Sequence, residues 1–192
     1  METAYIACVD GSARQQENTP RIFAEMFREV KYKRVIELGT GTGAFTYFLA
    51  ASSQSTQVFS FDIDTPEHLT KIRSIGVQFI YANVFEYEQP IASLIAGSGR
   101  TLLLCDGGDK AREVKTFAKY LKVDDVIMAH DYALSKEAFH VHHYWRSLEL
   151  VYEDVRVTCE QENLQPFWPN RMLSVGWLSR IKAESHGDGI HT

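Results

Sequence analysis

The sequence predicts an α/β fold: a seven-stranded, mostly parallel sheet with helices on both faces and an antiparallel hairpin at its C-terminal end. The first observation is that short apolar runs alternate with segments of helical periodicity, which is typical of a parallel sheet. The second is that several runs are almost entirely apolar, as strands buried on both faces are. The third is that two late runs are separated by only three residues, a connection that permits antiparallel pairing alone.

Five apolar runs are expected to form the parallel part of the sheet. Each is short enough for a strand and is followed by turn-forming or acidic residues. In chain order they are Val35–Leu38, Val58–Ile63, Val77–Tyr81, Thr101–Cys105 and Asp125–Ala129.

The hairpin is expected from Leu164–Trp168 and Met172–Ile181, with Pro169–Arg171 as the turn. Pro166 and Pro169 favour an edge position for the first of these strands, because proline cannot donate a hydrogen bond to a neighbouring strand.

Three helices have recognisable signals. Thr19-Pro20 and Thr65-Pro66 each combine an N-cap residue with proline at the first helical position. A third helix is expected over Lys110–Lys122, where apolar residues recur at helical spacing and basic residues fill the remaining turns. We interpret that basic face as solvated.

Composition indicates one globular domain. The chain has 192 residues, of which 45% are hydrophobic and 23% charged, which is enough apolar material for one core. We divide it into an N-terminal helical extension (1–34), a core (35–181) and a flexible tail (182–192). This length leaves no room for a separate substrate-binding domain.

Charge and cysteine content narrow the function. A net charge of −5 argues against a general binder of nucleic acid or anionic membranes. No apolar run is long enough to cross a membrane, and no signal-peptide pattern begins the chain. Cys8, Cys105 and Cys159 lack metal-binding spacing, so we interpret them as reduced thiols of a cytoplasmic protein.

The strongest motif is ELGTGTG at residues 37–43, between an apolar strand and a helix. Gly39 and Gly41 permit a tight turn and a close approach of a ligand to the backbone, and Gly43 lets the helix pack near the strand. Asp62 ends the next strand, where a carboxylate can accept hydrogen bonds from both hydroxyls of a ribose. The motif indicates a nucleoside-containing cofactor at the carboxyl ends of the strands.

Glu37 indicates which cofactor. In the dinucleotide fingerprint G-x-G-x-x-G, the helix N-terminus holds a pyrophosphate. Here the third glycine comes one residue early, and Glu37 stands two residues before the first glycine. A carboxylate is poorly placed beside a pyrophosphate but suits a cationic amino group. This favours S-adenosylmethionine over a nicotinamide dinucleotide.

The E-x-G-x-G-x-G pattern, with an acid after the second strand, resembles the class I S-adenosylmethionine-dependent methyltransferases over about Val35 to Ile181. The resemblance implies a Rossmann-like methyltransferase fold, with Glu37 at the amino end of the cofactor, directly or through water, and Asp62 at the ribose. Asn83 stands where many members carry an acid that contacts the adenine amine. The implied cofactor-binding residues are Glu37, Gly39, Thr40, Gly41, Gly43, Asp62, Asn83 and Asp106.

A metal site is expected at two further strand ends. Asp106 follows one strand, and His130 and Asp131 follow the next. Neighbouring strand ends lie about 5 Å apart, so these side chains should converge beside the methyl group of the cofactor. Carboxylates with one imidazole suit Mg²⁺ or Mn²⁺.

The arrangement resembles metal-dependent O-methyltransferases of the catechol O-methyltransferase and macrocin O-methyltransferase/cephalosporin hydroxylase-like groups. His130 departs from both patterns because it replaces the first carboxylate of a pair. It would soften the site towards manganese, iron or zinc. Structural roles for all three residues stay open.

Methyl transfer from a sulfonium requires an aligned acceptor oxygen and removal of its proton. A metal would lower the pKa of that oxygen. The candidate catalytic residues are Asp106, Asp109, Lys110 and His130. Asp109 stands at the offset where the macrocin-type group places its base, but it is equally a good N-cap for the following helix.

The acceptor is expected to be a small molecule: a phenol, a sugar or a secondary metabolite. Ser135–Trp145 carries histidines and aromatic residues that would suit a flat phenol or a sugar ring, although the segment also fits an ordinary amphipathic helix. The acceptor site would be either small and open or completed by a second copy of the chain.

The sequence thus favours a cytoplasmic S-adenosylmethionine-dependent O-methyltransferase assisted by a divalent cation. One alternative is a non-catalytic S-adenosylmethionine-binding module, which His130 in place of an acid would favour. The other is a nicotinamide-dependent oxidoreductase, against which Glu37 and the early third glycine argue.

Overall fold

A computed structural model of the chain describes residues 5–8, 11–53, 56–138 and 150–184, with side chains from Gln15 onward. Its centre is the predicted seven-stranded sheet, in the order β10-β11-β7-β6-β3-β4-β5. Every strand of this sheet runs parallel to the others except β11, which is antiparallel to both of its neighbours. The strands are β3 (Arg34–Leu38), β4 (Gln57–Asp62), β5 (Gln78–Tyr81), β6 (Thr101–Cys105), β7 (Val126–Ala129), β10 (Leu164–Pro166) and β11 (Leu178–Lys182).

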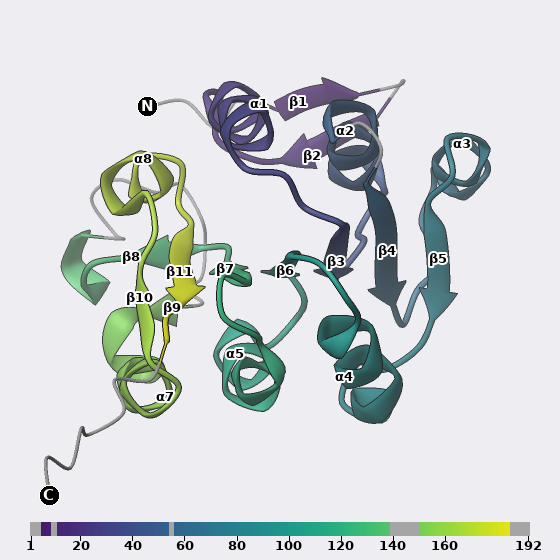
Figure 1. The fold of residues 1–192 in the computed structure, drawn as a ribbon. Coiled ribbons are helices and arrows are strands. Elements are labelled where there is room, and N and C mark those ends of the chain that lie inside the picture. Colours follow the sequence, from purple (N-terminus) through teal and green to yellow (C-terminus); the bar gives the residue numbers. More distant parts are fainter. Residues whose placement is uncertain (1–4, 9–10, 54–55, 139–149, 185–192) are drawn as a thin grey trace, which may run out of the picture.

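Helices cover both faces of the sheet, as predicted (Figure 1). Each face has its own apolar core, centred on side chains such as Phe23 and Trp177 on one side and Phe61 and Phe117 on the other. The first face carries α1 (Thr19–Glu29), α2 (Ala44–Ser52), α3 (Leu69–Ser74) and α8 (Pro169–Leu173). The second carries α4 (Glu88–Ala96), α5 (Lys110–Phe117) and α7 (Arg156–Gln161).

The C-terminal antiparallel pair is confirmed, but its predicted three-residue turn is wrong. Trp168 adopts a left-handed conformation (φ +48°), and the chain then forms α8 instead of returning at once. Met172, expected in a strand, is a fully buried helical residue in the core. The strand resumes only at Leu178, because proline at the start of α8 is compatible with a helix N-terminus and the helix buries Met172.

Two helix boundaries also differ from those predicted. The helix expected from Pro66 begins at Leu69, after a turn. The helix expected over Lys110–Lys122 ends at Phe117 and continues as the 3₁₀ helix η1 (Ala118–Tyr120).

Short elements flank the sheet. Ahead of α1, the segment expected to be a helical extension contains an antiparallel hairpin of β1 (Tyr5–Cys8) and β2 (Gly11–Arg14), which lies beside α2. Beyond β7, β8 (Tyr132–Ala133) pairs in parallel with β9 (Leu150–Val151), and the 3₁₀ helix η2 (Tyr152–Asp154) follows. Of the tail expected to be flexible, Lys182 belongs to β11, and residues 185–192 lie outside the described part. Across the described residues, no helix combines the length and apolarity needed to cross a membrane.

Strand order places the site. The chain reverses its direction of strand addition at β3, which has β4 on one side and β6 on the other. Ligands bind such doubly wound sheets at the carboxyl ends of the strands beside this switch point. Here the amide of Asp106 donates to the carbonyl of Leu38 (2.8 Å), so the loops after β3 and β6 are held together.

Gly39 makes that contact possible. Its φ is +95°, and a Cβ built on it would lie 2.4 Å from the carbonyl oxygen of Asp106. Gly76 has a similar φ of +88° but has no atom within 4 Å of a built Cβ. Both glycines therefore have a backbone conformation that L-residues rarely adopt, but only at Gly39 would a side chain also clash with neighbouring atoms.

We predict that Gly76→Ala lowers the free energy of unfolding by about 1 kcal/mol, the cost of an L-residue in the left-handed region. Gly39→Ala should cost about 3 kcal/mol or more, because backbone must also move to relieve the clash. Urea unfolding of both variants measures the difference. Equal losses would contradict the close packing of the two loops.

Candidate functional site

The predicted glycine loop has the conformation its sequence requires. Gly39, Gly41 and Gly43 all have positive φ, and Gly43 is the N-cap residue of α2. The side chain of Asp62 binds this loop: its Oδ2 accepts from the amides of Thr40 (2.8 Å) and Gly41 (2.9 Å). A Cβ on Gly41 would meet no atom within 4 Å, so the loop presents open backbone at this point.

Glu37 lies beneath the loop and is 1% exposed. Its Oε2 accepts from the hydroxyls of Thr46 (2.6 Å) and Ser60 (2.5 Å), and Ser60 is also hydrogen-bonded to Thr40. Burial raises the pKa of Glu37 to about 8, against the lowering effect of these two hydroxyls. Glu37 is therefore predominantly protonated at neutral pH unless a cation is bound nearby.

Asn83 lies after β5, at the same edge of the sheet. Its Oδ1 accepts from the amide of Phe85 (3.1 Å), and its Nδ2 donates to Glu86 (3.1 Å). The side chain is exposed and organises its own turn. The amide of Asp64 donates to Asp62 Oδ1 (3.0 Å).

Asp106, His130 and Asp131 converge as predicted. One potential ligand atom from each lies within 4.8 Å of the others. His130 Nδ1 is 3.0 Å from Asp106 Oδ1 and 3.6 Å from Asp131 Oδ1. Among the described residues, Asp131 Oδ1 is one of the few buried side-chain oxygens without a hydrogen bond, and Asp131 has a left-handed φ of +54°. Strain and an unsatisfied buried oxygen are features that functional sites retain.

The pKa of His130 is raised. Burial by itself would lower that pKa, but the charge of Asp106, its hydrogen bond to the ring and the charge of Asp131 together outweigh burial. The cluster therefore favours an added positive charge at its centre, either a proton on His130 or a bound cation.

Asp109 and Lys110 lie at the start of α5 with separate roles. Asp109 caps the helix, because its Oδ1 accepts from the amide of Arg112 (3.0 Å). Lys110 is 4% exposed; its Nζ donates to the carbonyl of Gly107 (2.7 Å) and lies 3.2 Å from Asp131 Oδ2. Lys110 thus joins the loop after β6 to the loop after β7.

Three neighbours of this cluster were not predicted as site residues. Glu113 is 1% exposed, and its Oε2 accepts from the amide of Gly107 (3.4 Å). Gln15 and Trp177 adjoin Asp106 and His130 from opposite ends of the chain. Gln15 and Trp177 have only a weak signal in the sequence, because neither residue lies in a motif or follows a parallel strand. The predicted acceptor segment Ser135–Trp145 lies outside the described residues beyond Ala138.

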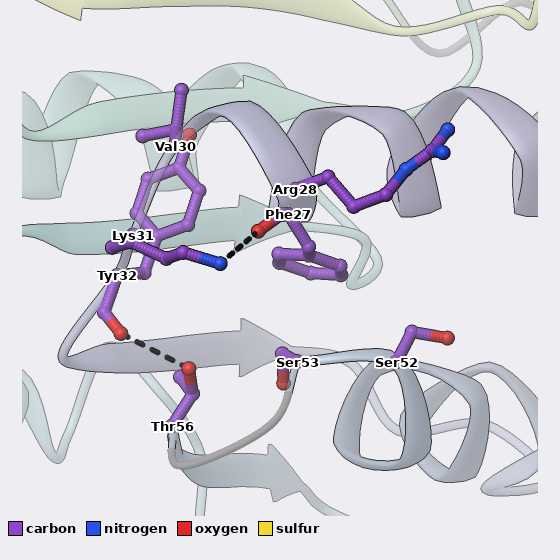
Figure 2. A pocket seen from close by; sticks show the side chains of 8 residues that line it. All are labelled: Phe27, Arg28, Val30, Lys31, Tyr32, Ser52, Ser53 and Thr56. Carbon is purple, nitrogen blue, oxygen red and sulfur yellow. Dashed lines mark hydrogen bonds between the residues drawn. The ribbon is translucent and has the colours of Figure 1, made fainter.

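A separate cavity of about 350 Å³ opens at the other end of β3, where α1 and α2 end (Figure 2). Within it, Lys31 Nζ donates to the carbonyl of Phe27 (3.4 Å) and Thr56 Oγ1 to that of Tyr32 (3.0 Å). The length of the strand separates this cavity from the glycine loop, so it takes no part in the candidate site. Its lining residues are Phe27, Arg28, Val30, Lys31, Tyr32, Ser52, Ser53 and Thr56.

Comparison with known proteins agrees with this geometry. The family model of the FtsJ-like methyltransferases matches residues 21–159. No curated protein matches the sequence. Solved structures share the fold at low identity, and O-methyltransferases are prominent among them.

Three structures illustrate that likeness. The apo form of CmcI is 11% identical with a TM-score of 0.63, over 92% of this chain and 76% of its own. A Staphylococcus aureus protein assigned as a caffeoyl-CoA O-methyltransferase is 13% identical with a TM-score of 0.61, over 86% and 83%. Cofactor-bound Rv0187 from MTB is 14% identical with a TM-score of 0.57, over 88% and 81%.

Glu37 should make stability fall as pH rises. Its pKa is about 8 in the folded protein against 4.5 as the ordinary value, so unfolding releases a proton between these limits. Below pH 4.5, Glu37 causes no loss of stability. By pH 8, the free energy of unfolding has fallen by at most roughly 5 kcal/mol because of Glu37. Burial raises the pKa of Glu113 to about 7. Glu113 therefore adds its own decline in stability with rising pH, which ends at a lower pH than that of Glu37.

We predict that Glu37→Gln makes the decline in stability between pH 4.5 and 8 shallower. The parts due to Glu113 and, above pH 6.5, to His130, whose pKa is also raised, remain in this variant. Urea unfolding between pH 4.5 and 8.5 tests this, with the exposed residue Glu17 changed to Gln as the control. A pH dependence of stability in Glu37→Gln that equals that of the wild type from pH 4.5 to 8 would show that Glu37 ionises normally.

Proposed function

Since the chain belongs to the FtsJ-like methyltransferase family, an S-adenosylmethionine-dependent family, we propose that it transfers a methyl group to an oxygen of a small hydroxylated acceptor. The observation that carries this proposal is the junction of two groups of residues. The glycine loop with Glu37 and Asp62 adjoins the Asp106–His130–Asp131 cluster through the contact of Gly39 with Asp106. One group suits the cofactor and the other suits a reacting hydroxyl.

The residues of the first group fit S-adenosylmethionine. Gly41 leaves open space above the loop, and the Asp62 carboxylate lies at the end of β4 beside it. We assign Asp62 to the ribose hydroxyls and the backbone of Gly39, Thr40, Gly41 and Gly43 to the methionine part. Glu37, held by two hydroxyls, supplies negative charge beneath the amino end. We assign Asn83 to the adenine, because its amide nitrogen has two hydrogens and its bond to Glu86 uses one of them.

S-adenosylmethionine, when bound, supplies a methyl group that is already activated on a sulfonium. The protein then has to orient the acceptor and remove its proton. When no metal ion is bound, we assign proton removal to the Asp106–His130 pair, in which Asp106 accepts the Nδ1–H of His130 and the opposite ring nitrogen acts as the base. Asp109 is occupied as a helix cap and Lys110 as an ionic link, so both act through structure.

The cluster also fits a divalent cation. It offers two carboxylates and one imidazole at suitable separation, including the unsatisfied Oδ1 of Asp131. We propose that Asp106, His130 and Asp131 would hold Mg²⁺ or Mn²⁺, with the His130 imidazole deprotonated as a ligand. As a Lewis acid, the ion would lower the pKa of an acceptor hydroxyl and so replace His130 as the means of proton removal. The Mg-SAM structure of CmcI, 12% identical with a TM-score of 0.59 over 90% of this chain and 75% of its own, supports looking for such an ion.

Binding of the cofactor product tests the first part. We predict that S-adenosylhomocysteine binds in calorimetry and that Asp62→Ala weakens it by about 10-fold or more, because charged hydrogen bonds are lost. Asp64→Ala is the matched control, since Asp64 bonds to Asp62 through its backbone alone. Absence of binding to the wild type would overturn the proposal.

Metal removal tests the second part. We predict that Mn²⁺ binds with an affinity that rises with pH, because the ion must displace the proton that the cluster favours on His130. EDTA should then abolish methyl transfer to a catechol acceptor. Activity that survives EDTA would contradict the metal and leave the Asp106–His130 pair as sole catalyst.

A further inference from the structure

Gln15 links the two ends of the chain to the centre of the cluster. It lies in the short segment between β2 and α1 and is 2% exposed. Its Nε2 donates to Asp106 Oδ2 (3.2 Å), and its Oε1 accepts from Trp177 Nε1 (3.1 Å). Gln15 is thus a buried polar side chain that bridges the acid after β6 and the indole that precedes β11.

The orientation of the Gln15 amide follows from its partners. An indole nitrogen can only donate a hydrogen bond, so the oxygen of the amide must face Trp177. The amide nitrogen then faces Asp106, whose ionised carboxylate can only accept. A flipped amide would oppose donor to donor and acceptor to acceptor. Trp177 therefore determines which end of Gln15 reaches the acid.

Trp177 orients His130 as well. The His130 ring stacks on the indole, with 4.7 Å between ring centroids and 27° between planes. His130 Nδ1 meets Asp106 Oδ1, whereas Gln15 meets Oδ2. The edge of the indole positions one partner of Asp106 and its face positions the other. Both carboxylate oxygens are held from fixed directions, which sets the plane of the carboxylate.

We propose that Gln15 is a positioning residue for methyl transfer: it fixes the Asp106 carboxylate in the plane in which Asp106 orients His130. The proposal rests on the proposed function of the Asp106–His130 pair. A carboxylate has about four acceptor directions, so one bond from Gln15 leaves Oδ2 able to bind a further group. Orientation of this kind by residues around a site commonly changes activity by about 10- to 100-fold.

Gln15→Met tests the inference, because methionine keeps the length of the side chain and removes both polar groups. Gln16→Met is the matched control one residue away. With an acceptor that the wild type methylates, kcat should fall about 10- to 100-fold in Gln15→Met. The Kd of S-adenosylhomocysteine should change less than about 2-fold, and Gln16→Met should keep wild-type kcat.

The indole N–H of Trp177 gives a second readout that needs neither cofactor nor acceptor. The NMR resonance of this N–H can be assigned because it disappears in Trp177→Phe. Its chemical shift should change in Asp106→Asn, because Gln15 bonds to both Asp106 and the indole and transmits the loss of the carboxylate charge. Most of that shift should vanish when Asp106→Asn is made in the Gln15→Met background. Any part of the change in chemical shift that remains would be transmitted through His130, which stacks on the indole.

Two results would overturn the inference: wild-type kcat in Gln15→Met, or an Asp106→Asn shift of the indole resonance that is equal in both backgrounds. Failure of the proposed function looks different. In that case the wild type binds no S-adenosylhomocysteine, while the indole resonance still reports whether Gln15 couples Trp177 to Asp106.

Discussion

The contact between the loops after β3 and β6 is the constraint on which the site depends. Parallel strands would in any case end side by side, but the bond from the Asp106 amide to the Leu38 carbonyl brings the two loops into direct backbone contact. Only glycine at position 39 allows this approach. Because Asp106 belongs to the Asp106–His130–Asp131 cluster and Gly39 to the glycine loop, this one contact sets the distance between the parts of the site proposed for the methyl donor and for the acceptor.

Several ionisable groups are buried around this contact, and each is compensated differently. Glu37 keeps two hydroxyl donors and a raised pKa. Glu113 supports the amide of Gly107, whereas Lys110 bonds to the carbonyl of the same residue. Both the amide and the carbonyl of Gly107 are thereby bound by side chains of α5. Burial costs such groups stability, so their presence next to the strand ends is more easily explained by a site than by the fold.

The parts of this structure that could be predicted from sequence are those with local signals. Apolar runs followed by acids located five parallel strands, and the spacing of glycines located the loop. The turn before β11 could not be predicted, because Trp168 takes a left-handed conformation that its residue type does not favour and α8 is stabilised by burial of Met172. The contacts of Gln15 with Asp106 and Trp177 could not be predicted for a related reason: these partners are 91 and 162 residues away. Only tertiary packing shows that a glutamine before a helix belongs to a site after β6.

The meeting of Gln15 and Trp177 at Asp106 also affects the order in which the site can form. The glycine loop, Asp62 and the acid cluster all precede residue 132, so a growing chain could fold them while the last strands are still being made. Trp177 comes later, just ahead of the antiparallel strand that inserts between β7 and β10. The carboxylate at the centre of the site would thus acquire its final orientation only after Trp177 has been made and its indole packs against Gln15 and His130.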